Sequence, residues 1–379
     1  MKNIKLLKLS PIYGNNSGDV AISKCIEYLF SNKKVGVTSE DLLFRVPFSY
    51  TPGRGVKNNR IAISTFLQYN FPIFFYVLKK LIFVLSGDRK KLRSKLESYD
   101  ALIFGGGNIV MTKMGSDYGY RLLSFSKNLN KPIIIFGAGA GPLPYDSKKI
   151  INGLAKNCDK LYLRDKVSLE YFPPDFKKAQ VVIDPAFVIS DIAPPVKKNK
   201  GQYLGVNIIY GFLNHDDFVE LAHSVAKLAR DNLLGIKVIC TAYPHDALES
   251  LKFKDLVQSI QSGLTVKVIN VPGEPTGIAD SYADVAYFIG CRMHSLIFAL
   301  SYGIPSIGFA WDPKVRGMFE MFCRNKDILE EFMVGDPGRI SFDVYRSFNI
   351  NSAVARAKKD VYKAVDEIVM ELLNVTKTK

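Results

Sequence analysis

The sequence has few cysteines, and none of them form a pair at metal-binding spacing. Its five cysteines are widely separated among 379 residues and include no CxxC or CxxxC pair. Structural zinc sites use closely spaced cysteine pairs, and disulfide scaffolds need a denser set. The sequence therefore predicts no metal site and no disulfide framework, and it favours a reducing compartment.

The chain also lacks low-complexity segments and nucleic-acid-binding motifs. Hydrophobic residues make up 47% of it and charged residues 23%, which is ordinary for folded globular domains. The net charge of +15 indicates an anionic partner, which could be nucleic acid, acidic lipid or a phosphorylated substrate. The basic residues are scattered and form no zinc-finger or RNP-like pattern, so we expect no nucleic acid partner.

No signal-peptide core is present at the start of the sequence. The first ten residues, MKNIKLLKLS, are apolar runs interrupted by Lys5 and Lys8. An apolar core of signal-peptide length cannot form there, so this segment predicts a first strand and a cytoplasmic protein.

One strongly apolar segment, residues 66–86, is interrupted by Pro72 and by the lysine pair at 79 and 80, which argues against a membrane-spanning helix. A basic cluster at 89–93 follows it. Two interpretations of residues 66–93 stay open. One is an amphipathic element lying on an anionic lipid surface, which would make the protein peripheral on the inner face of the cytoplasmic membrane. The other is a buried core helix with a solvated basic end.

Short apolar runs alternate with amphipathic stretches in both halves of the chain, which is typical of parallel βαβ units. The strands are expected at residues 2–10, 101–106, 132–141, 160–165, 179–186, 203–210, 235–244, 265–273, 285–292 and 305–312. The helices are expected at residues 19–30, 147–159, 217–232, 295–303 and 353–374.

The length is about twice that of a usual domain, which predicts two domains. Residues 190–202 combine paired prolines, lysines and a glycine without periodicity, and so form the best linker candidate. We predict Rossmann-like α/β domains at 1–192 and 200–348, facing each other across a cleft. The final segment, 349–379, is a helix that is a candidate to pack back on the N-terminal domain. Ligands of such sheets bind at the carboxyl ends of the strands, so the functional motifs should follow strands.

Two glycine-rich turns follow predicted strands. FGGGNIV contains Gly106, Gly107 and Asn108, and GAGAGP contains Gly139 and Gly141. Glycines let backbone amides approach a ligand, and they can clear a cleft wall for a sugar or phosphate. A tight strand-to-helix turn needs glycine as well, so both interpretations stand.

The segment NNSGDVAI joins the first strand to the first helix. Asn16, Gly18 and Asp19 could leave free amides pointing at an anion. Plain capping of the helix by Ser17 or Asp19 is the alternative.

Two further polar pairs follow strands. Arg164 could present its planar guanidinium to a phosphate or carboxylate, or it could pair with Asp165 at the surface while that pair caps the next helix. His245, beside Asp246, could bind acceptor hydroxyls, or the two could form a simple turn.

The most informative segment is FIGCRMHSLIFALSYGIPSIGFAWDPK. Arg292 and His294 follow a predicted strand and precede a helix, so they lie near a helix amino end, where anions bind. Histidine ordinarily titrates near a pKa of about 6.5 and can be tuned toward acid catalysis. Lys314 follows the next strand and would point into the same cleft, although a solvated loop lysine is the commoner case.

These motifs, together with DPAF and LRDKVSLEYF, occur in an order that resembles the polysaccharide pyruvyltransferase family over about 80% of the chain. The Arg-x-His pair with the downstream lysine is the specific part. The resemblance implies a fold like the GT-B glycosyltransferases. It also implies transfer of a pyruvyl group from phosphoenolpyruvate to two sugar hydroxyls, giving a ketal. It implies no metal and no nucleotide cofactor.

The resemblance also implies roles for individual residues. His294 would protonate the methylene carbon of phosphoenolpyruvate, and Arg164, Arg292 and Lys314 would bind its phosphate and carboxylate. The acceptor would be a sugar of a polysaccharide or lipid-linked precursor, for which the sequence shows no motif. The alternatives are a glycosyltransferase that uses a nucleotide sugar, for which Glu274 is the one hint, and a non-catalytic glycan-binding protein of the same fold.

Overall fold

Two parallel β-sheets organise the chain, each in its own structural unit. The computed structural model describes residues 4–13, 16–45, 67–68, 70–174, 176–195, 201–243 and 246–377. Unit 1 comprises Met1–Tyr13, Leu29–Val182 and Ala364–Lys379, and unit 2 comprises Gly14–Tyr28 and Ile183–Lys363.

The sheet of unit 1 has six parallel strands in the order β2-β1-β3-β4-β5-β6. Its strands are β1 (Lys5–Ser10), β2 (Gly36–Asp41), β3 (Ala101–Gly105), β4 (Ile133–Ala138), β5 (Lys160–Leu163) and β6 (Ala179–Val181). Nearly every residue of β1, β3 and β4 is buried, because parallel strands are covered on both faces. This burial explains their continuous apolar sequences.

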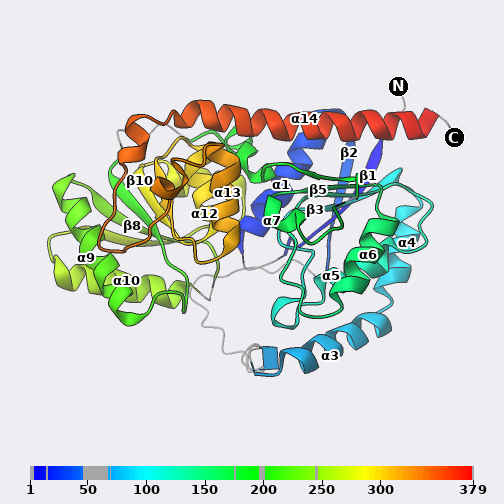
Figure 1. Ribbon diagram of the computed structural model, residues 1–379, viewed down its shortest axis with the longest axis horizontal. Coiled ribbons are helices and arrows are strands. Elements are labelled where there is room, and N and C mark those ends of the chain that lie inside the picture. The colour runs from blue at the N-terminus through cyan, green and yellow to red at the C-terminus, as the bar shows by residue number, and fades with distance from the viewer. Residues whose placement is uncertain are drawn as a thin grey trace. The chain divides into compact units, whose positions relative to one another are not determined.

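Unit 1 has five helices and one 3-10 turn among its described residues outside α1 and α14. They are α3 (Pro72–Leu85), α4 (Asp88–Leu96), α5 (Tyr118–Ser126), α6 (Ser147–Asn157) and α7 (Lys166–Leu169), with a short 3-10 turn η1 (Lys113–Gly115). Helices α5 and α6 lie side by side, and α3 contacts η1 at the outside of the unit (Figure 1). The buried core between helices and sheet includes Leu7, Phe104 and Ile135.

The sheet of unit 2 has five parallel strands in the order β11-β10-β7-β8-β9. Its strands are β7 (Tyr203–Asn207), β8 (Gly235–Cys240), β9 (Val266–Asn270), β10 (Val285–Gly290) and β11 (Ser306–Gly308). Its helices are α8 (Ile189–Ile192), α9 (His215–Asp231), α10 (Ala247–Ile260), α11 (Pro275–Tyr282), α12 (Met293–Ser301) and α13 (Pro313–Cys323), with 3-10 turns η2 (Pro185–Val188), η3 (Leu329–Phe332) and η4 (Asp343–Arg346). Helices α9 and α10 pack together against β8 (Figure 1).

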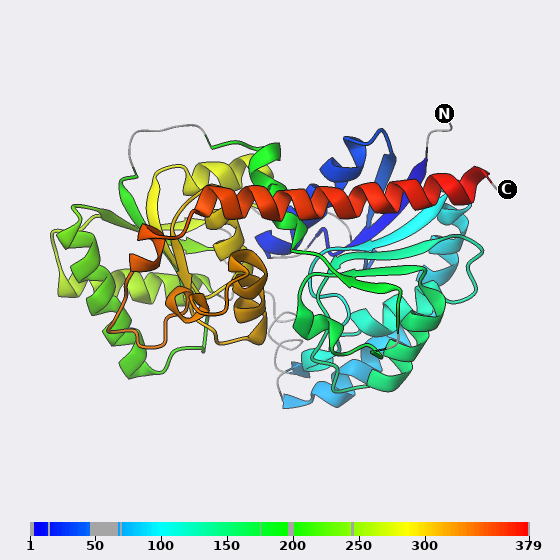
Figure 2. The same cartoon turned by 45° about the horizontal axis from the view of Figure 1, so that its top comes forward.

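Two helices contain residues of both units. Helix α1 (Ser17–Ser31) has its first turns in unit 2, and α14 (Ile350–Lys377), drawn in red in Figure 2, has its last part in unit 1. Within unit 1, that last part forms ion pairs from Asp366 to Lys33 at 2.5 Å and from Glu371 to Lys160 at 3.7 Å.

The ten predicted strand positions all carry strands, and the chain is a two-unit parallel α/β protein with Rossmann-like sheets, as predicted. The sequence analysis missed β2. This edge strand has a partly exposed and polar sequence, GVTSED, so it lacks the apolar pattern of its neighbours.

The unit boundary differs from the predicted one at residues 192–200. Residues 183–192 belong with unit 2, because η2 and α8 pack on α12 and Phe187 stacks on Phe322 of α13 at a centroid distance of 5.4 Å. Residues 14–28 also belong with unit 2, not with the N-terminal domain. Apolar composition does not reveal such exchanges, since either sheet could bury these side chains.

None of the helices in the described part of the chain is long and apolar enough to cross a membrane.

Candidate functional site

The order of strands in the second sheet marks one position for a ligand. Strands β7 and β10 are neighbours, and the chain continues from β7 to one side and from β10 to the other. The loops after two such strands diverge, which leaves room at their carboxyl ends. Asn207 is the last residue of β7, and Arg292 follows β10, so both lie at this position.

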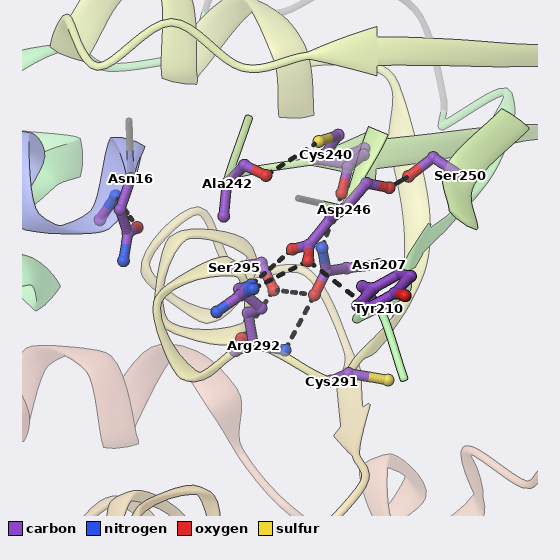
Figure 3. Close-up of polar contacts among 12 residues, drawn as sticks. Asn16, Asn207, Tyr210, Cys240, Ala242, Asp246, Ser250, Cys291, Arg292 and Ser295 are labelled. Atoms are coloured by element: carbon purple, nitrogen blue, oxygen red, sulfur yellow. Dashed lines mark hydrogen bonds and ion pairs between the residues drawn. The ribbon is translucent and has the colours of Figure 1, made fainter. Parts of the chain in front are cut away.

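Arg292 is held by a buried carboxylate. Its Nε and Nη2 donate to the two carboxylate oxygens of Asp246, at 2.5 Å and 2.8 Å, and Figure 3 shows the guanidinium turned edge-on to this carboxylate. Asp246 has no exposed surface, whereas a quarter of the Arg292 side chain remains exposed. Such a two-point bond fixes the plane of the guanidinium and leaves its Nη1 edge for another acceptor.

The ionic state of this pair follows from its surroundings. Burial acts to lower the pKa of Arg292, but the hydrogen bonds and charge of Asp246 outweigh it and raise the pKa above its usual value. Burial raises the pKa of two neighbouring thiols, to about 11 for Cys240 and about 12 for Cys291. Arg292 is therefore a permanent cation, and both thiols are neutral at physiological pH.

Asn207 organises the turn that presents Arg292. Its Oδ1 accepts from the Arg292 backbone N–H at 2.8 Å and from the Ser295 hydroxyl at 3.1 Å, and its Nδ2 donates to the Ile239 carbonyl at 2.8 Å (Figure 3). The same hydroxyl lies 2.6 Å from the Arg292 carbonyl, so its one hydrogen is shared between the two acceptors. One buried amide thus ties the ends of β7 and β8 to the first turn of α12.

His294 lies in the first turn of α12 and is 8% exposed. Its Nε2 lies 3.5 Å from Oδ2 of Asp184, a buried carboxylate that also caps η2 by accepting from Ala186 N–H at 2.9 Å. Within the described residues, Nε2 makes no hydrogen bond. A carboxylate facing Nε2 favours the tautomer that carries its hydrogen there.

The other side of the imidazole packs directly on Gly18. A Cβ atom at residue 18 would lie 2.2 Å from Nδ1 of His294 and 2.5 Å from its Cγ, so only glycine fits. Gly18 has ordinary helical geometry, and its N–H donates to Oδ1 of Asn16 at 2.9 Å. The glycine of NNSGD therefore makes room for the histidine.

The first turn of α1 is attached to the second sheet. Ser17 donates its backbone N–H to Thr241 O at 2.9 Å and its hydroxyl to Val271 O at 2.6 Å, just after β8 and β9. Asn16 forms a bridge to Ala242 and, from its side chain, caps the helix. Capping by Ser17, one of the alternatives that the sequence left open, is therefore wrong, because its hydroxyl donates to Val271 O and Asn16 caps the helix. Asp19 lies in the same first turn.

The structure says less about the two other predicted site residues of this half of the chain, Lys314 and His245. Lys314 lies in the first turn of α13, where its Nζ is 3.9 Å from Oδ2 of Asp312 and its backbone N–H donates to the same carboxylate. It is mostly buried rather than the solvated loop lysine that was the alternative. His245 lies outside the described residues.

Unit 1 has a separate cluster around Arg164, which follows β5. Arg164 and Asp165 are both buried, at 5% and 1% exposure, and Nε of Arg164 lies 3.7 Å from Oδ2 of Asp165, so the alternative of a pair holds but its surface position is wrong. Asp165 does cap the next helix, α7, by accepting from Ser168 N–H at 2.6 Å. A Cβ at Gly139 would lie 2.9 Å from the Arg164 guanidinium and 2.6 Å from Oδ1 of Asn108. Gly139 thus lets both side chains approach the backbone after β4. Binding of the donor phosphate by Arg164 stays a prediction.

In the glycine-rich turns of unit 1, the backbone N–H groups of Gly106 and Gly139 donate to backbone carbonyls of the same unit. Gly106 N–H donates to Phe136 O at 3.1 Å, and Gly139 N–H donates to Gly107 O at 2.9 Å. Both Gly106 and Gly107 have positive φ, near +74° and +73°. These amides are engaged within the fold, which supports the tight-turn interpretation.

The backbone groups of Gly141 also bond within the protein. Gly141 has φ of +74°, its N–H donates to Val110 O at 2.8 Å, and its carbonyl accepts from Nδ2 of Asn108 at 2.8 Å. A Cβ there would lie 2.1 Å from the ring of Tyr171. The space that the glycine leaves is filled by a tyrosine rather than by a ligand.

Sequence reasoning missed three residues of the site, Asn207, Asp246 and Asp184. Each is buried and polar, and each follows or ends an apolar strand, which is the signal that could have found it. Asp246 was interpreted as part of a turn, and Asp184 was quoted only as part of DPAF. Their partners are distant in sequence, so the pairing itself could not be predicted.

No group of three or more histidine, cysteine, aspartate or glutamate side chains is arranged to hold a metal ion in the part of the chain that the structure describes.

Solved structures share this fold at low sequence identity. A putative UDP-N-acetylglucosamine 2-epimerase from Listeria monocytogenes matches with 11% identity and a TM-score of 0.56, over 100% of this chain and 98% of that one. The HepE protein of Anabaena in complex with UDP-glucose matches with 9% identity and a TM-score of 0.54, over 100% of both chains.

A chain of the accessory secretory protein 1, 2 and 3 structure from Streptococcus pneumoniae is less similar. It has 12% identity and a TM-score of 0.49, and the match covers 76% of this chain and 58% of that one. No curated protein matches the sequence. The likeness to solved structures supports the two Rossmann-like units and nothing further.

One protein-family model matches the sequence, and it is more specific than the structural similarity. The model described as polysaccharide pyruvyl transferase matches residues 16–313, well over half of the chain, from Asn16 before α1 to Pro313 at the start of α13. The match contains the Arg292 and His294 site together with Gly18, Asp184 and Asp246. The chain belongs to the polysaccharide pyruvyl transferase family and is a transferase.

Proposed function

We propose that this protein transfers a pyruvyl group from phosphoenolpyruvate to two hydroxyls of one sugar in a polysaccharide or lipid-linked glycan precursor. The products are a cyclic pyruvate ketal and phosphate. The observation that carries the proposal is the Arg292–Asp246 pair at the divergence of β7 and β10, two residues from a buried histidine that faces Asp184.

Arg292 suits an anionic donor. Phosphoenolpyruvate carries a carboxylate and a phosphate, and either can accept from the guanidinium edge that Asp246 leaves unused. Because Asp246 already fixes the plane of the group, little conformational entropy is lost when the donor binds. In this proposal Asp246 is a positioning residue, and Arg292 contacts the substrate.

His294 is the proposed proton donor. It protonates the methylene carbon of phosphoenolpyruvate, which becomes the methyl group, and the central carbon becomes cation-like. A sugar hydroxyl adds to that carbon and gives its proton back to the imidazole. Asp184, whose Oδ2 lies 3.5 Å from Nε2, orients the ring.

The second half of the reaction closes the ketal. The bond between the central carbon and the phosphate oxygen breaks, and the second hydroxyl of the same sugar attacks the carbon and passes its proton to the departing phosphate. Lys314, in the first turn of α13, is the proposed cation for that phosphate. The scheme needs neither a metal ion nor a nucleotide.

The test is release of phosphate from phosphoenolpyruvate with candidate glycan acceptors, and mass spectrometry of the acceptor for an added pyruvyl group. We expect His294→Ala to reduce phosphate release by roughly a hundredfold or more, since general acid catalysis contributes about that much. The matched control is His223→Ala on the exposed face of α9, which should keep full activity. Full activity of His294→Ala would refute the acid role.

A thermal-shift comparison separates this function from the nucleotide-sugar alternative. A ligand that binds only the folded protein raises its melting temperature. We expect phosphoenolpyruvate to stabilise the wild type but not Arg292→Ala. Stabilisation by UDP or GDP and not by phosphoenolpyruvate would instead favour glycosyl transfer.

A further inference from the structure

Helix α3 exposes a continuous row of apolar side chains. Phe74, Val77, Leu81 and Val84 are spaced by three or four residues along one side of the helix, and Leu85 lies four residues after Leu81 on the same side; we call these five residues the apolar stripe of α3. Each is more than half exposed, from 55% at Leu81 to 76% at Leu85. A contiguous apolar surface of this kind on a folded protein marks an interaction site.

The opposite side of α3 is anchored to unit 1. Phe75, Tyr76 and Phe83 are buried. Tyr76 stacks on Tyr145 at a centroid distance of 5.1 Å, and Phe83 packs edge-on against Phe125 at 5.2 Å. The helix is therefore held mainly by its aromatic face, and most of the surface of the apolar stripe stays outside that attachment.

The two lysines within this apolar segment turn toward the protein. Lys80 forms an ion pair with Asp146 at 2.6 Å, and Lys79 lies 4.4 Å above the ring of Phe75. Burial lowers the pKa of Lys79, although nearby Asp117 partly opposes this. The sequence places charges inside an apolar run, but the folded helix keeps them off its outer face.

A basic helix follows immediately. Helix α4 begins three residues after α3 ends and has the sequence DRKKLRSKL, in which five basic residues and one acidic residue give a net charge of +4. The side chains of Lys90, Lys91 and Arg93 are exposed. An apolar surface bordered by cations is complementary to a bilayer with anionic headgroups.

We propose that the apolar stripe of α3 inserts into the headgroup region of an anionic lipid bilayer, with the basic side chains of α4 contacting lipid phosphates. With 14 residues, α3 is too short to cross the hydrocarbon core, so it lies along the surface. The exposure of the stripe also decides against the buried core helix that the sequence left open. This inference does not depend on the proposed reaction, because lipid binding needs no turnover.

The experiment is co-sedimentation of the full chain with vesicles of phosphatidylcholine alone and of phosphatidylcholine mixed with phosphatidylglycerol. We expect wild-type protein to bind the mixed vesicles. Val77→Ser/Leu81→Ser should reduce the bound fraction at least tenfold, because each lost apolar side chain weakens partitioning by roughly that factor. Both positions are exposed, so the melting temperature should stay unchanged.

Two further variants complete the design. Leu248→Ser/Leu251→Ser removes two exposed apolar side chains from α10 and should bind vesicles like the wild type. Lys90→Gln/Arg93→Gln should lower binding to the mixed vesicles and reduce its sensitivity to salt. Vesicle binding by Val77→Ser/Leu81→Ser equal to that of the wild type would overturn the proposal. So would a wild-type dimer in lipid-free solution that this variant makes monomeric, since the stripe would then bind a second copy.

Discussion

Replacing Gly18 by alanine tests whether the imidazole of His294 must lie where the structure places it. The new Cβ would lie 2.2 Å, 2.5 Å and 2.7 Å from the Nδ1, Cγ and Cβ atoms of His294. Real Cβ atoms do not approach other heavy atoms this closely, so the imidazole must move. Gly18 has ordinary helical geometry, and the substitution therefore adds no backbone strain.

The magnitudes separate an effect on stability from an effect on catalysis. Overpacking a core costs about 1–3 kcal/mol, and alanine gains up to about 1 kcal/mol over glycine in a helix, so the net loss of stability is roughly 0–3 kcal/mol. The protein should remain folded. Displacement of a general acid, by contrast, should lower kcat by roughly a hundredfold.

The assay is the steady-state rate of phosphate release together with the melting temperature. Gly263→Ala is the matched control, since no heavy atom lies within 4 Å of the Cβ that it would add. In a His294→Ala background the clash disappears, so adding Gly18→Ala should cost little further activity or stability. A Gly18→Ala enzyme with normal kcat would refute the reasoning. So would a double variant whose loss of kcat equals the product of the losses in the two single variants, because the two substitutions would then act independently.

Three other predictions address the same unit. Asp246→Asn leaves the Arg292 cation buried without its partner, so we expect it to destabilise the protein by about 3–5 kcal/mol in chemical denaturation and to raise KM for phosphoenolpyruvate. Asp184→Asn should lower kcat more than it raises KM, whereas a merely structural role would change the melting temperature alone. The raised pKa values of Cys240 and Cys291, about 11 and 12, mean that these thiols ionise first in the unfolded chain. Their stabilising contribution is complete below about pH 8.5 and falls by roughly 1.4 kcal/mol per thiol per pH unit above it, until the folded pKa is reached. Cys291→Ala should therefore flatten the alkaline loss of stability in urea titrations, and an unchanged slope would contradict the assignment.

The fold could be predicted from the sequence because most strands have a clear apolar pattern. Strands such as β3 and β4 are buried on both faces and read as continuous apolar runs, which leaves little ambiguity. Edge strand β2 escaped notice because its exposed positions carry polar residues. The short η2 and α8 segments were assigned to the wrong unit, since their packing on α12 is set by tertiary structure and not by local pattern.

Only those residues of the candidate site that belong to a local sequence pattern could be predicted. Arg292 and His294 stand out because they follow a strand and precede a helix, which is a local pattern. Their partners Asp246 and Asp184 lie 46 and 110 positions away along the chain, and no periodicity links such residues. Gly18 was selected for a free amide, whereas the structure shows that its missing side chain is what matters.

The exchange of residues 14–28 into unit 2 has a consequence for synthesis on the ribosome. This segment emerges early, but the strands that hold it, β8 and β9, are made more than two hundred residues later. The contacts of Asn16 and Ser17 with the segments after β8 and β9 therefore form only after those strands have been made. His294, the proposed proton donor, can pack on Gly18 only after the chain has been translated past residue 294, so this contact joins an early and a late part of the sequence.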